Sequence, residues 1–289
     1  MKTFFKVSNL RVNLFGKLPF LKPLESLLLR LFMIPTFFLV RANGLEHIKD
    51  RNGPVIFAFN HNNALESVLV PACLVYHSGG KKISFIIDWM FGKIPLLEQL
   101  FKLMDPVYVY HKRSPLRFIE SKRPKTGKMR DTVSLCCERL REGKRVGIFP
   151  EGKRNSDPHR LLRAKPGIGH IALISEAPVI PVGINCVSGK KRKKVRALGR
   201  MTLNIGKPLH FKNLSNAYRR AGAAGSPSVP TERERHMLAH EAATRIMSVI
   251  AGLCGKEYIY SAHMEKPGTT TKAIRNNNNH TIKEVICPV

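Results

Sequence analysis

The chain has 289 residues, of which 43% are apolar, so it can form one large domain with a substantial core, and wholesale disorder is excluded. Its 49 Lys and Arg residues against 20 Asp and Glu give a formal net charge of +29 at pH 7. Such a charge indicates an anionic partner, and because no nucleic-acid-binding module or zinc-finger spacing is recognisable, we expect a membrane surface and phosphorylated substrates, and no nucleic acid.

Residues 1–43 are predicted to associate with a membrane. Cations are scattered among Phe and Leu at the start, and an uninterrupted apolar stretch runs from Leu31 to Val40. That stretch is shorter than the roughly 20 residues needed to span a bilayer, and Pro35 would kink a helix there. We therefore expect an interfacial anchor, with apolar side chains in the lipid and cations at the anionic headgroups. The alternative is a helix that packs on the domain as part of its core.

Beyond this segment, short apolar strands alternate with helices. The expected strands are 55–59, 83–87, 107–110, 145–149, 178–184 and 196–205, and the expected helices are 67–76, 91–104, 130–141 and 170–175. This alternation is typical of an α/β domain with a largely parallel central sheet flanked by helices, here over residues 44–212. Residues 213–266 are predicted to form a linker, at 221–230, and a helix that opens at Thr231. Residues 267–289 are predicted to be a disordered tail.

The first strand of this domain, Val55–Phe59, runs into Asn60 and His61, and Glu66 follows. If His61 lies in the turn and Glu66 in the first turn of the next helix, capped by Asn62 or Asn63, the carboxylate can steer the imidazole as a general base. The alternative is structural. Residues Asn63 to Glu66 also fit a capping box, and His61 would then be an ordinary turn histidine. As a turn residue, His61 is expected to face solvent and to contribute little packing.

A second motif follows the strand at 145–149, which ends in Pro150-Glu-Gly-Lys-Arg154. Glycine lets the backbone approach a ligand closely, and arginine offers a fork of donors that matches phosphate. The turn could therefore bind an anionic group. Both motifs lie at the carboxyl ends of strands, where the ligands of such sheets gather. The alternative is a charged surface turn without a ligand.

Together, Asn60-His61-x4-Glu66 and Phe149-Pro-Glu-Gly-Lys-Arg154 resemble the glycerolipid acyltransferase family, which includes the 1-acylglycerol-3-phosphate acyltransferases. Its first motif is N-H-x4-D and its third is F-P-E-G-T-R. The strand ending at Arg113 and the proline-bearing strand Ala177–Val182 also fit two weaker motifs of the family. Four motifs in order, over roughly residues 40–212, are a specific signal, whereas any one alone would be weak.

The resemblance implies an acyltransferase at the cytoplasmic face of a membrane, bound as a monotopic or peripheral protein. His61 and Glu66 would be its catalytic pair, and backbone amides near His61 would stabilise the oxyanion. Glu151, Gly152 and Arg154 would bind the acceptor, with Arg113 and Lys153 as phosphate partners, the two arginines at neighbouring strand ends. The donor would be acyl-CoA or acyl carrier protein, and the acceptor a lysophospholipid, with 1-acylglycerol-3-phosphate expected.

The sequence departs from the family pattern in ways that leave the acceptor open. Glu66 replaces the usual aspartate, Lys153 replaces threonine, and residues 87–90 lack the lysine that many members carry between the first two motifs. An acceptor of amino-acid lipid, glycolipid or lipid A type is therefore the alternative. A non-catalytic basic protein that binds membranes or nucleic acid is a further one. The six cysteines have no metal-ligand spacing, and we expect no metal or redox cofactor.

Overall fold

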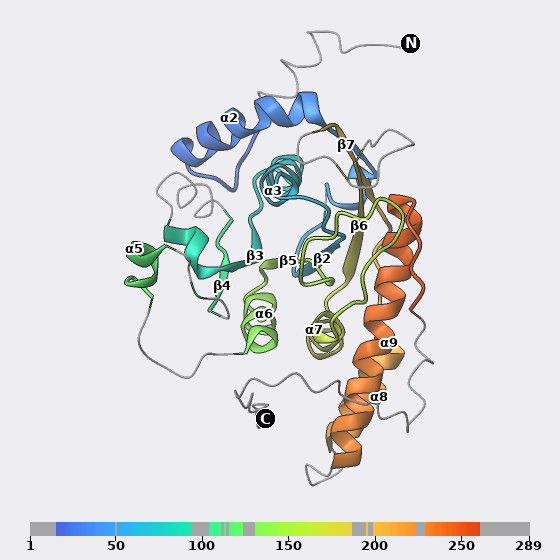
Figure 1. The fold of residues 1–289 in the computed structure, drawn as a ribbon. Helices are drawn as coiled ribbons and strands as arrows, with labels where there is room; N and C mark the ends of the chain where they lie inside the picture. Colours follow the sequence, from blue (N-terminus) through green and yellow to red (C-terminus); the bar gives the residue numbers. More distant parts are fainter. Residues whose placement is uncertain are drawn as a thin grey trace, which may run out of the picture.

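The fold is built on a mixed β-sheet with strand order β1-β7-β6-β2-β5-β3-β4 (Figure 1). The structure is a computed structural model that describes residues 16–49, 51–93, 104–110, 113, 116–123, 131–186, 195, 199–223 and 229–260. The strands are β1 (Val40–Asn43), β2 (Val55–Phe59), β3 (Ile83–Asp88), β4 (Val107–Val109), β5 (Arg145–Ile148), β6 (Val179–Cys186) and β7 (Met201–Ile205).

The predicted α/β fold with a mostly parallel sheet is confirmed. Strands β4, β3, β5, β2 and β6 are parallel, while β7 runs antiparallel to β6 and β1 pairs in parallel with β7. Strand β1 is not among the strands that we predicted, the first of which was 55–59. It is a short edge strand whose partner β7 lies far along the chain, so its own residues carry no strong strand pattern.

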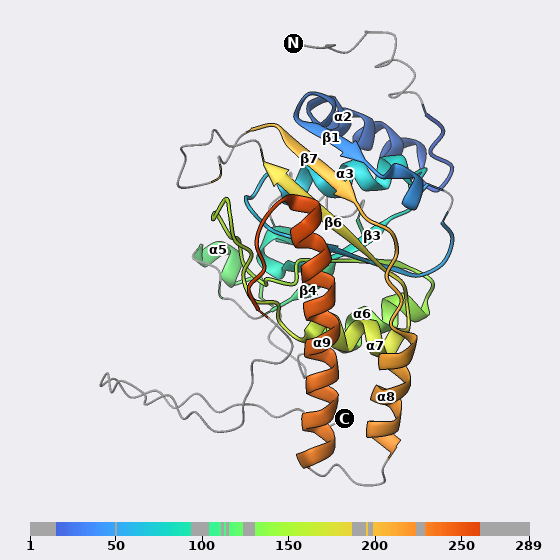
Figure 2. The ribbon, with the colours of Figure 1, turned by 90° about the vertical axis from the view of Figure 1, so that its right-hand side faces the viewer.

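Helices cover both faces of the sheet (Figures 1 and 2). Helices α2 (Pro23–Leu39) and α3 (Glu66–His77) lie on one face, and α6 (Thr132–Arg141), α7 (Gly167–Ser175) and α9 (Val229–Cys254) lie on the other. Successive side chains of β2 enter these two cores in turn, Phe57 and Phe59 on the α3 side and Ile56 and Ala58 on the α7 side. All five residues of β2 are buried, which explains its continuous apolar run.

Helix α2 accounts for the apolar N-terminal stretch. It contains Pro35, and it buries Leu29 and Met33 in the core shared with α3. Its opposite face is exposed, and the apolar residues there recur at helical spacing: Leu24 (67% exposed), Leu27 (55%), Leu31 (54%), Ile34 (46%) and Phe38 (65%). The helix therefore packs on the domain, as in the alternative of a core helix. It also presents the exposed apolar surface that an interfacial membrane anchor requires. Within the described ranges, no helix is long and apolar enough to cross a membrane.

The C-terminal part differs from the prediction. Residues from Lys212 to Ala223 form a helix, α8, that we did not predict, and it lies alongside α9 (Figure 2). Helix α9 packs its Ala243, Ile246 and Ile250 into the core under the sheet. The predicted linker at 221–230 falls partly in α8 and α9 and partly outside the described residues. The predicted tail at 267–289 lies wholly outside the described residues.

Two further predictions concern the segments between β3 and β5. The predicted helix at 91–104 begins within a 3₁₀ helix, η2 (Trp89–Lys93), and residues 94–103 lie outside the described residues. A short helix, α5 (Arg117–Glu120), is not among the helices that we predicted. It follows Arg113 and lies at one side of the molecule (Figure 1). A 3₁₀ helix, η1 (Leu45–His47), joins β1 to the segment before β2.

Candidate active site

The two principal sequence motifs meet at the carboxyl edge of the sheet, as predicted. Strands β2 and β5 are parallel neighbours, with Ala58 opposite Ile148, so the residues that follow them emerge side by side. The backbone N–H of His61 donates to Oε1 of Glu151 over 3.0 Å. The backbone N–H of Asn155 donates to the carbonyl oxygen of His61 over 2.7 Å. Each motif thus fixes the backbone of the other.

His61 lies in the turn between β2 and α3, and its Nδ1 is 3.5 Å from Oε2 of Glu66. This is an ion-pair distance, but its geometry is not that of a hydrogen bond: among the described residues, Nδ1 is buried without a hydrogen-bond partner. Unliganded enzymes often hold such contacts long, and they tighten when the substrate binds. The side chain of His61 is only 14% exposed, and its ring packs on that of Phe149, with centroids 4.3 Å apart. Our expectation of a solvent-facing histidine was therefore wrong.

Glu66 is the first residue of α3 and is fully buried. Its Oε2 accepts the backbone N–H groups of Asn62 at 2.7 Å and Asn63 at 3.3 Å. Its Oε1 accepts the Asn62 side-chain amide at 2.7 Å and the Cys186 thiol at 3.1 Å. These four donors offset the cost of burying a carboxylate and fix its position beside the imidazole.

Glu66 also forms the capping box that we considered as the structural alternative. Oδ1 of Asn63 accepts the backbone N–H of Glu66 at 3.2 Å, while Glu66 accepts that of Asn63. Oδ1 of Asn63 also accepts the N–H of Leu65 at 2.9 Å, so Asn63 caps the start of the helix. The two interpretations of Glu66 are compatible, because the same carboxylate caps the start of α3 and lies beside Nδ1 of His61.

The amides of the turn are already engaged. We expected backbone N–H groups near His61 to stabilise an oxyanion, but those of His61, Asn62 and Asn63 donate to Glu151 and Glu66. These three groups therefore position the turn. In this conformation they are therefore not available to an oxyanion.

Glu151 is buried, and its carboxylate accepts hydrogen bonds from other groups of the protein. Besides the His61 N–H, it accepts the backbone N–H of Leu162 at 2.9 Å and the side-chain amide of Asn155 at 3.1 Å. Burial raises the pKa of the Glu151 carboxyl, and these donors work against the rise. The carboxylate thus joins the two motifs, and the geometry favours this role over direct contact with an acceptor.

The rest of the second motif faces outward. Gly152 has a φ of +68°, which an L side chain rarely adopts, and this sharp turn leaves Lys153 and Arg154 exposed next to the His61 turn. Both cations are available to an anionic group. The sequence prediction of acceptor contacts at Gly152, Lys153 and Arg154 remains a proposal.

Arg113 lies elsewhere than we predicted. We placed Arg113 and Arg154 at neighbouring strand ends, but β3 separates β4 from β5. Strands are about 4.8 Å apart, so β4 is roughly 10 Å from β5 and 14 Å from β2. Arg113 is exposed, and a phosphate held by Arg154 would need to be displaced toward β4 for Arg113 to reach it.

Sequence reasoning missed several groups that hold the site from other elements. Asn60 is fully buried and pairs with β6, its Oδ1 accepting the N–H of Ile184 at 2.6 Å. Cys186, at the end of β6, donates to Glu66, and burial together with the Glu66 charge raises the pKa of its thiol, so it is held protonated. Lys256 reaches the same turn from beyond α9. Of these three residues, only Asn60 could have been identified from the sequence, because it belongs to the first motif.

Comparison with known proteins now decides the family. The family model described as Acyltransferase matches residues 39–185, just over half of the chain. The chain belongs to the Acyltransferase family. The match begins at the end of α2 and includes β6 except for its last residue, Cys186, so it covers both motifs and the strands that bring them together.

Individual relatives are more distant. The chain is 24% identical over 177 residues to the chloroplastic 1-acyl-sn-glycerol-3-phosphate acyltransferase LPAT1 of Arabidopsis thaliana, covering 60% of this chain and 44% of that protein. It is 36% identical over 95 residues to Tafazzin of Drosophila melanogaster, covering 30% and 24%. The chain thus spans less than half the length of either relative. The crystal structure of the 1-acyl-sn-glycerophosphate acyltransferase PlsC from Thermotoga maritima aligns with a TM-score of 0.44 at 19% identity, covering 78% of this chain and 80% of that one.

Proposed function

We propose that this acyltransferase moves a fatty acyl group from a thioester donor, acyl-CoA or acyl carrier protein, to the hydroxyl of a lysophospholipid, with 1-acylglycerol-3-phosphate as the acceptor. The observation that carries the proposal is the buried Glu66 carboxylate 3.5 Å from Nδ1 of His61, beside the exposed cations Lys153 and Arg154. The activity for which the Arabidopsis relative is named supports the choice of acceptor.

In the proposed reaction, His61 takes the proton of the acceptor hydroxyl through Nε2 as the oxygen attacks the thioester carbonyl. The new C–O bond forms, the C–S bond breaks, and the leaving thiolate takes the proton back from the imidazolium. Glu66 keeps the Nδ1 proton of His61 in place and stabilises the imidazolium, as the carboxylate of a catalytic triad does. No acyl-enzyme intermediate is needed, and the residues of the turn require no metal for these steps.

The acceptor is the finer part of the proposal, and a thioester-release assay on the purified chain tests it. The panel contains 1-acylglycerol-3-phosphate, lysophospholipids with other headgroups, and acceptors of amino-acid lipid and glycolipid type, each with acyl-CoA and with acyl carrier protein. The proposal expects the highest kcat/KM with 1-acylglycerol-3-phosphate. Preference for an uncharged acceptor would favour the alternative motivated by Glu66 and Lys153. No release with any acceptor would favour a non-catalytic binding protein.

We expect Arg154→Lys to raise the KM for a phosphorylated acceptor and to leave the KM for the acyl donor unchanged. A lysine cannot reproduce the forked hydrogen bonds of arginine, and the loss should be about 1.5–3 kcal/mol, the contribution of a hydrogen bond to a charged group. Steady-state kinetics on both substrates measure this. Because β3 separates Arg113 from the second motif, Arg113→Lys should have the smaller effect. Unchanged acceptor kinetics in both variants would rule out phosphate recognition by these arginines.

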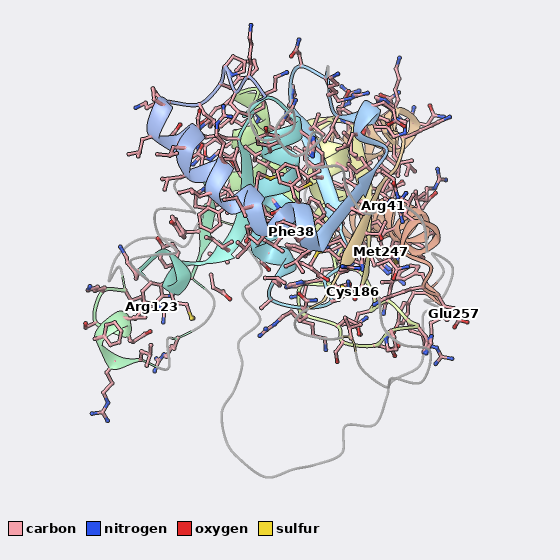
Figure 3. All side chains as sticks on the ribbon, turned by 90° about the horizontal axis from the view of Figure 1, so that it is seen from above. Phe38, Arg41, Arg123, Cys186, Met247 and Glu257 are labelled. Carbon is pink, nitrogen blue, oxygen red and sulfur yellow. The ribbon has the colours of Figure 1, made fainter. Side chains whose placement is uncertain are left out.

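We also propose that the chain binds the cytoplasmic face of a membrane without crossing it. The apolar stripe on α2, defined as Leu24, Leu27, Leu31, Ile34 and Phe38, supports this, together with the net charge of +29. Apolar side chains of this kind enter the headgroup boundary while nearby cations meet anionic lipid. Figure 3 looks onto this side of the molecule, where Phe38 and Arg41 lie close to each other at the end of α2.

Replacing three residues of the stripe, Leu24, Leu31 and Phe38, by serine should release the protein from vesicles that contain anionic phosphatidylglycerol. Sedimentation measures the bound fraction, and we expect the partition coefficient to fall at least about tenfold, since each large apolar side chain contributes on the order of 1 kcal/mol or more when it leaves water. The matched control replaces the exposed Met237 and Val249 of α9 by serine. Deleting residues 1–40 is a poorer test, because Leu29 and Met33 belong to the core. Unchanged sedimentation, or a protease-accessible segment on the far side of the vesicle, would contradict the proposal.

A further inference from the structure

Lys256, which follows the end of α9, places a positive charge against Asn62 in the His61 turn. Its Nζ donates to Oδ1 of Asn62 over 2.5 Å and to the carbonyl oxygen of Asp157 over 2.6 Å. It lies beyond the family match, which ends at residue 185, so neither motif accounts for it.

The backbone around Lys256 is fixed on both sides. Helix α9 ends at Cys254, Gly255 has a φ of +68°, and the N–H of Lys256 donates to the carbonyl of Ala251 over 3.1 Å, which is the closure of a Schellman motif. The next residue, Glu257, donates its N–H to the carbonyl of His159 over 2.7 Å. It also accepts the N–H of Leu161 over 2.9 Å. The end of α9 is thus joined to the loop after the second motif. This holds Lys256 where its side chain reaches Asn62 in the His61 turn and Asp157 in that loop.

Asn62 connects this lysine to Glu66. The Oδ1 of Asn62 accepts from Lys256, and its Nδ2 donates to Oε1 of Glu66 at 2.7 Å. Nδ2 of Asn62 also contacts the carbonyl of Ile184 at 3.1 Å, and Nδ2 of Asn60 donates weakly to Oδ1, at 3.3 Å. An ammonium only donates and a carboxylate only accepts, so an amide between them fits in one orientation. A flipped amide would place its oxygen against the Glu66 carboxylate and its NH2 group against the Lys256 ammonium, so the lysine adds to the preference for the observed orientation.

We propose that Lys256 is a positioning residue for acyl transfer, which fixes the Asn62 amide so that the Glu66 carboxylate faces Nδ1 of His61. The inference rests on the proposed function, because it assigns Lys256 a role in that reaction. The charge of Lys256 also acts on the second motif, where it opposes the rise in the pKa of Glu151 that burial causes. A single cation from the end of α9 therefore serves both buried carboxylates of the site.

The test compares Lys256→Met, which keeps the length and apolar stem of the side chain, with Lys256→Arg, which keeps the charge and the donors. We expect kcat to fall about tenfold or more in Lys256→Met, the cost of losing a hydrogen bond from a charged group, with KM for both substrates within about twofold of wild type. In Lys256→Arg, kcat should stay within about threefold of wild type. The matched control is Lys207→Met, at an exposed lysine in the loop after β7.

A double-mutant cycle with Glu66→Gln distinguishes positioning from a general effect on the fold. Because Lys256 acts through Asn62 on Glu66, Lys256→Met should lower kcat by less than about threefold in the Glu66→Gln background. An equal loss of kcat in both backgrounds, or wild-type kcat in Lys256→Met alone, would overturn the inference. If Lys256→Met does not fold, as judged by its thermal melt, Lys256→Gln takes its place in the same cycle with the same criteria, because its amide keeps one neutral donor.

The same experiment separates the failure of this inference from the failure of the proposed function. If Glu66→Gln itself keeps wild-type turnover, the proposed mechanism is wrong. If Glu66→Gln loses turnover while Lys256→Met keeps it, only the role of Lys256 is wrong.

Discussion

His61→Ala should lower kcat by about 100- to 10,000-fold, the usual contribution of a positioned general base. The structure also predicts a modest loss of stability, because the His61 side chain is 14% exposed and packs on Phe149. Thioester release and thermal melting of the purified variant measure the two effects separately. Near wild-type turnover in a folded His61→Ala variant would contradict the mechanism.

The matched control for this variant is His210→Ala, at an exposed histidine that follows β7. It should keep both wild-type kcat and wild-type melting temperature. His61→Gln is a useful companion, because glutamine fills more of the space beside Phe149 but cannot take a proton. Equal loss of kcat in the Ala and Gln variants, with a smaller loss of stability in Gln, would assign the catalytic effect to the imidazole and not to packing.

Glu66→Gln should lower kcat almost as much, by about 100- to 10,000-fold, because a neutral amide neither holds the required tautomer of His61 nor stabilises the imidazolium. It should also lower the melting temperature. Four protein donors converge on the buried carboxylate, and the amide NH2 of glutamine would place a donor against some of them. Kinetics at a temperature where the variant is folded separate the two losses.

Glu66→Asp keeps the charge but shortens the side chain by one methylene, so we expect an intermediate kcat. The control is Glu46→Gln, at a carboxylate that is 74% exposed. The cycle of Glu66→Gln with His61→Ala should be strongly non-additive, as expected of two residues that act as a unit. A fall in melting temperature with unchanged kcat would show that Glu66 only caps α3.

The sequence was enough to predict that the two motifs meet. Val55–Phe59 and the strand before Pro150 are short apolar runs with helices between them, and parallel strands place their carboxyl ends at one edge. The turn at His61 and the helix start at Glu66 followed from the same pattern. The order of strands did not follow, because neighbours in a sheet need not be neighbours in the chain, and this is why Arg113 was placed too close to the second motif.

The remaining parts of the site depend on contacts between distant segments. Lys256 and Cys186 have no local pattern, since a single lysine after a helix or a cysteine at a strand end is common, and only the packed fold brings them to Glu66 and Asn62. Strand β1 was missed for the same reason, because it needs β7 to pair with. The burial of His61 was missed because Phe149 comes from the second motif.

The central claim is acyl transfer by His61 to a lysophospholipid, and detection of the product by mass spectrometry tests it most directly. Purified wild-type chain and His61→Ala are each incubated with 1-acylglycerol-3-phosphate and acyl-CoA or acyl carrier protein in anionic vesicles. We predict that the diacyl product, phosphatidic acid, accumulates with the wild type and is at least about 100-fold slower with the variant. Equal product formation by both proteins, or no acylated product from the wild type with either donor and any acceptor of the panel, would contradict the account.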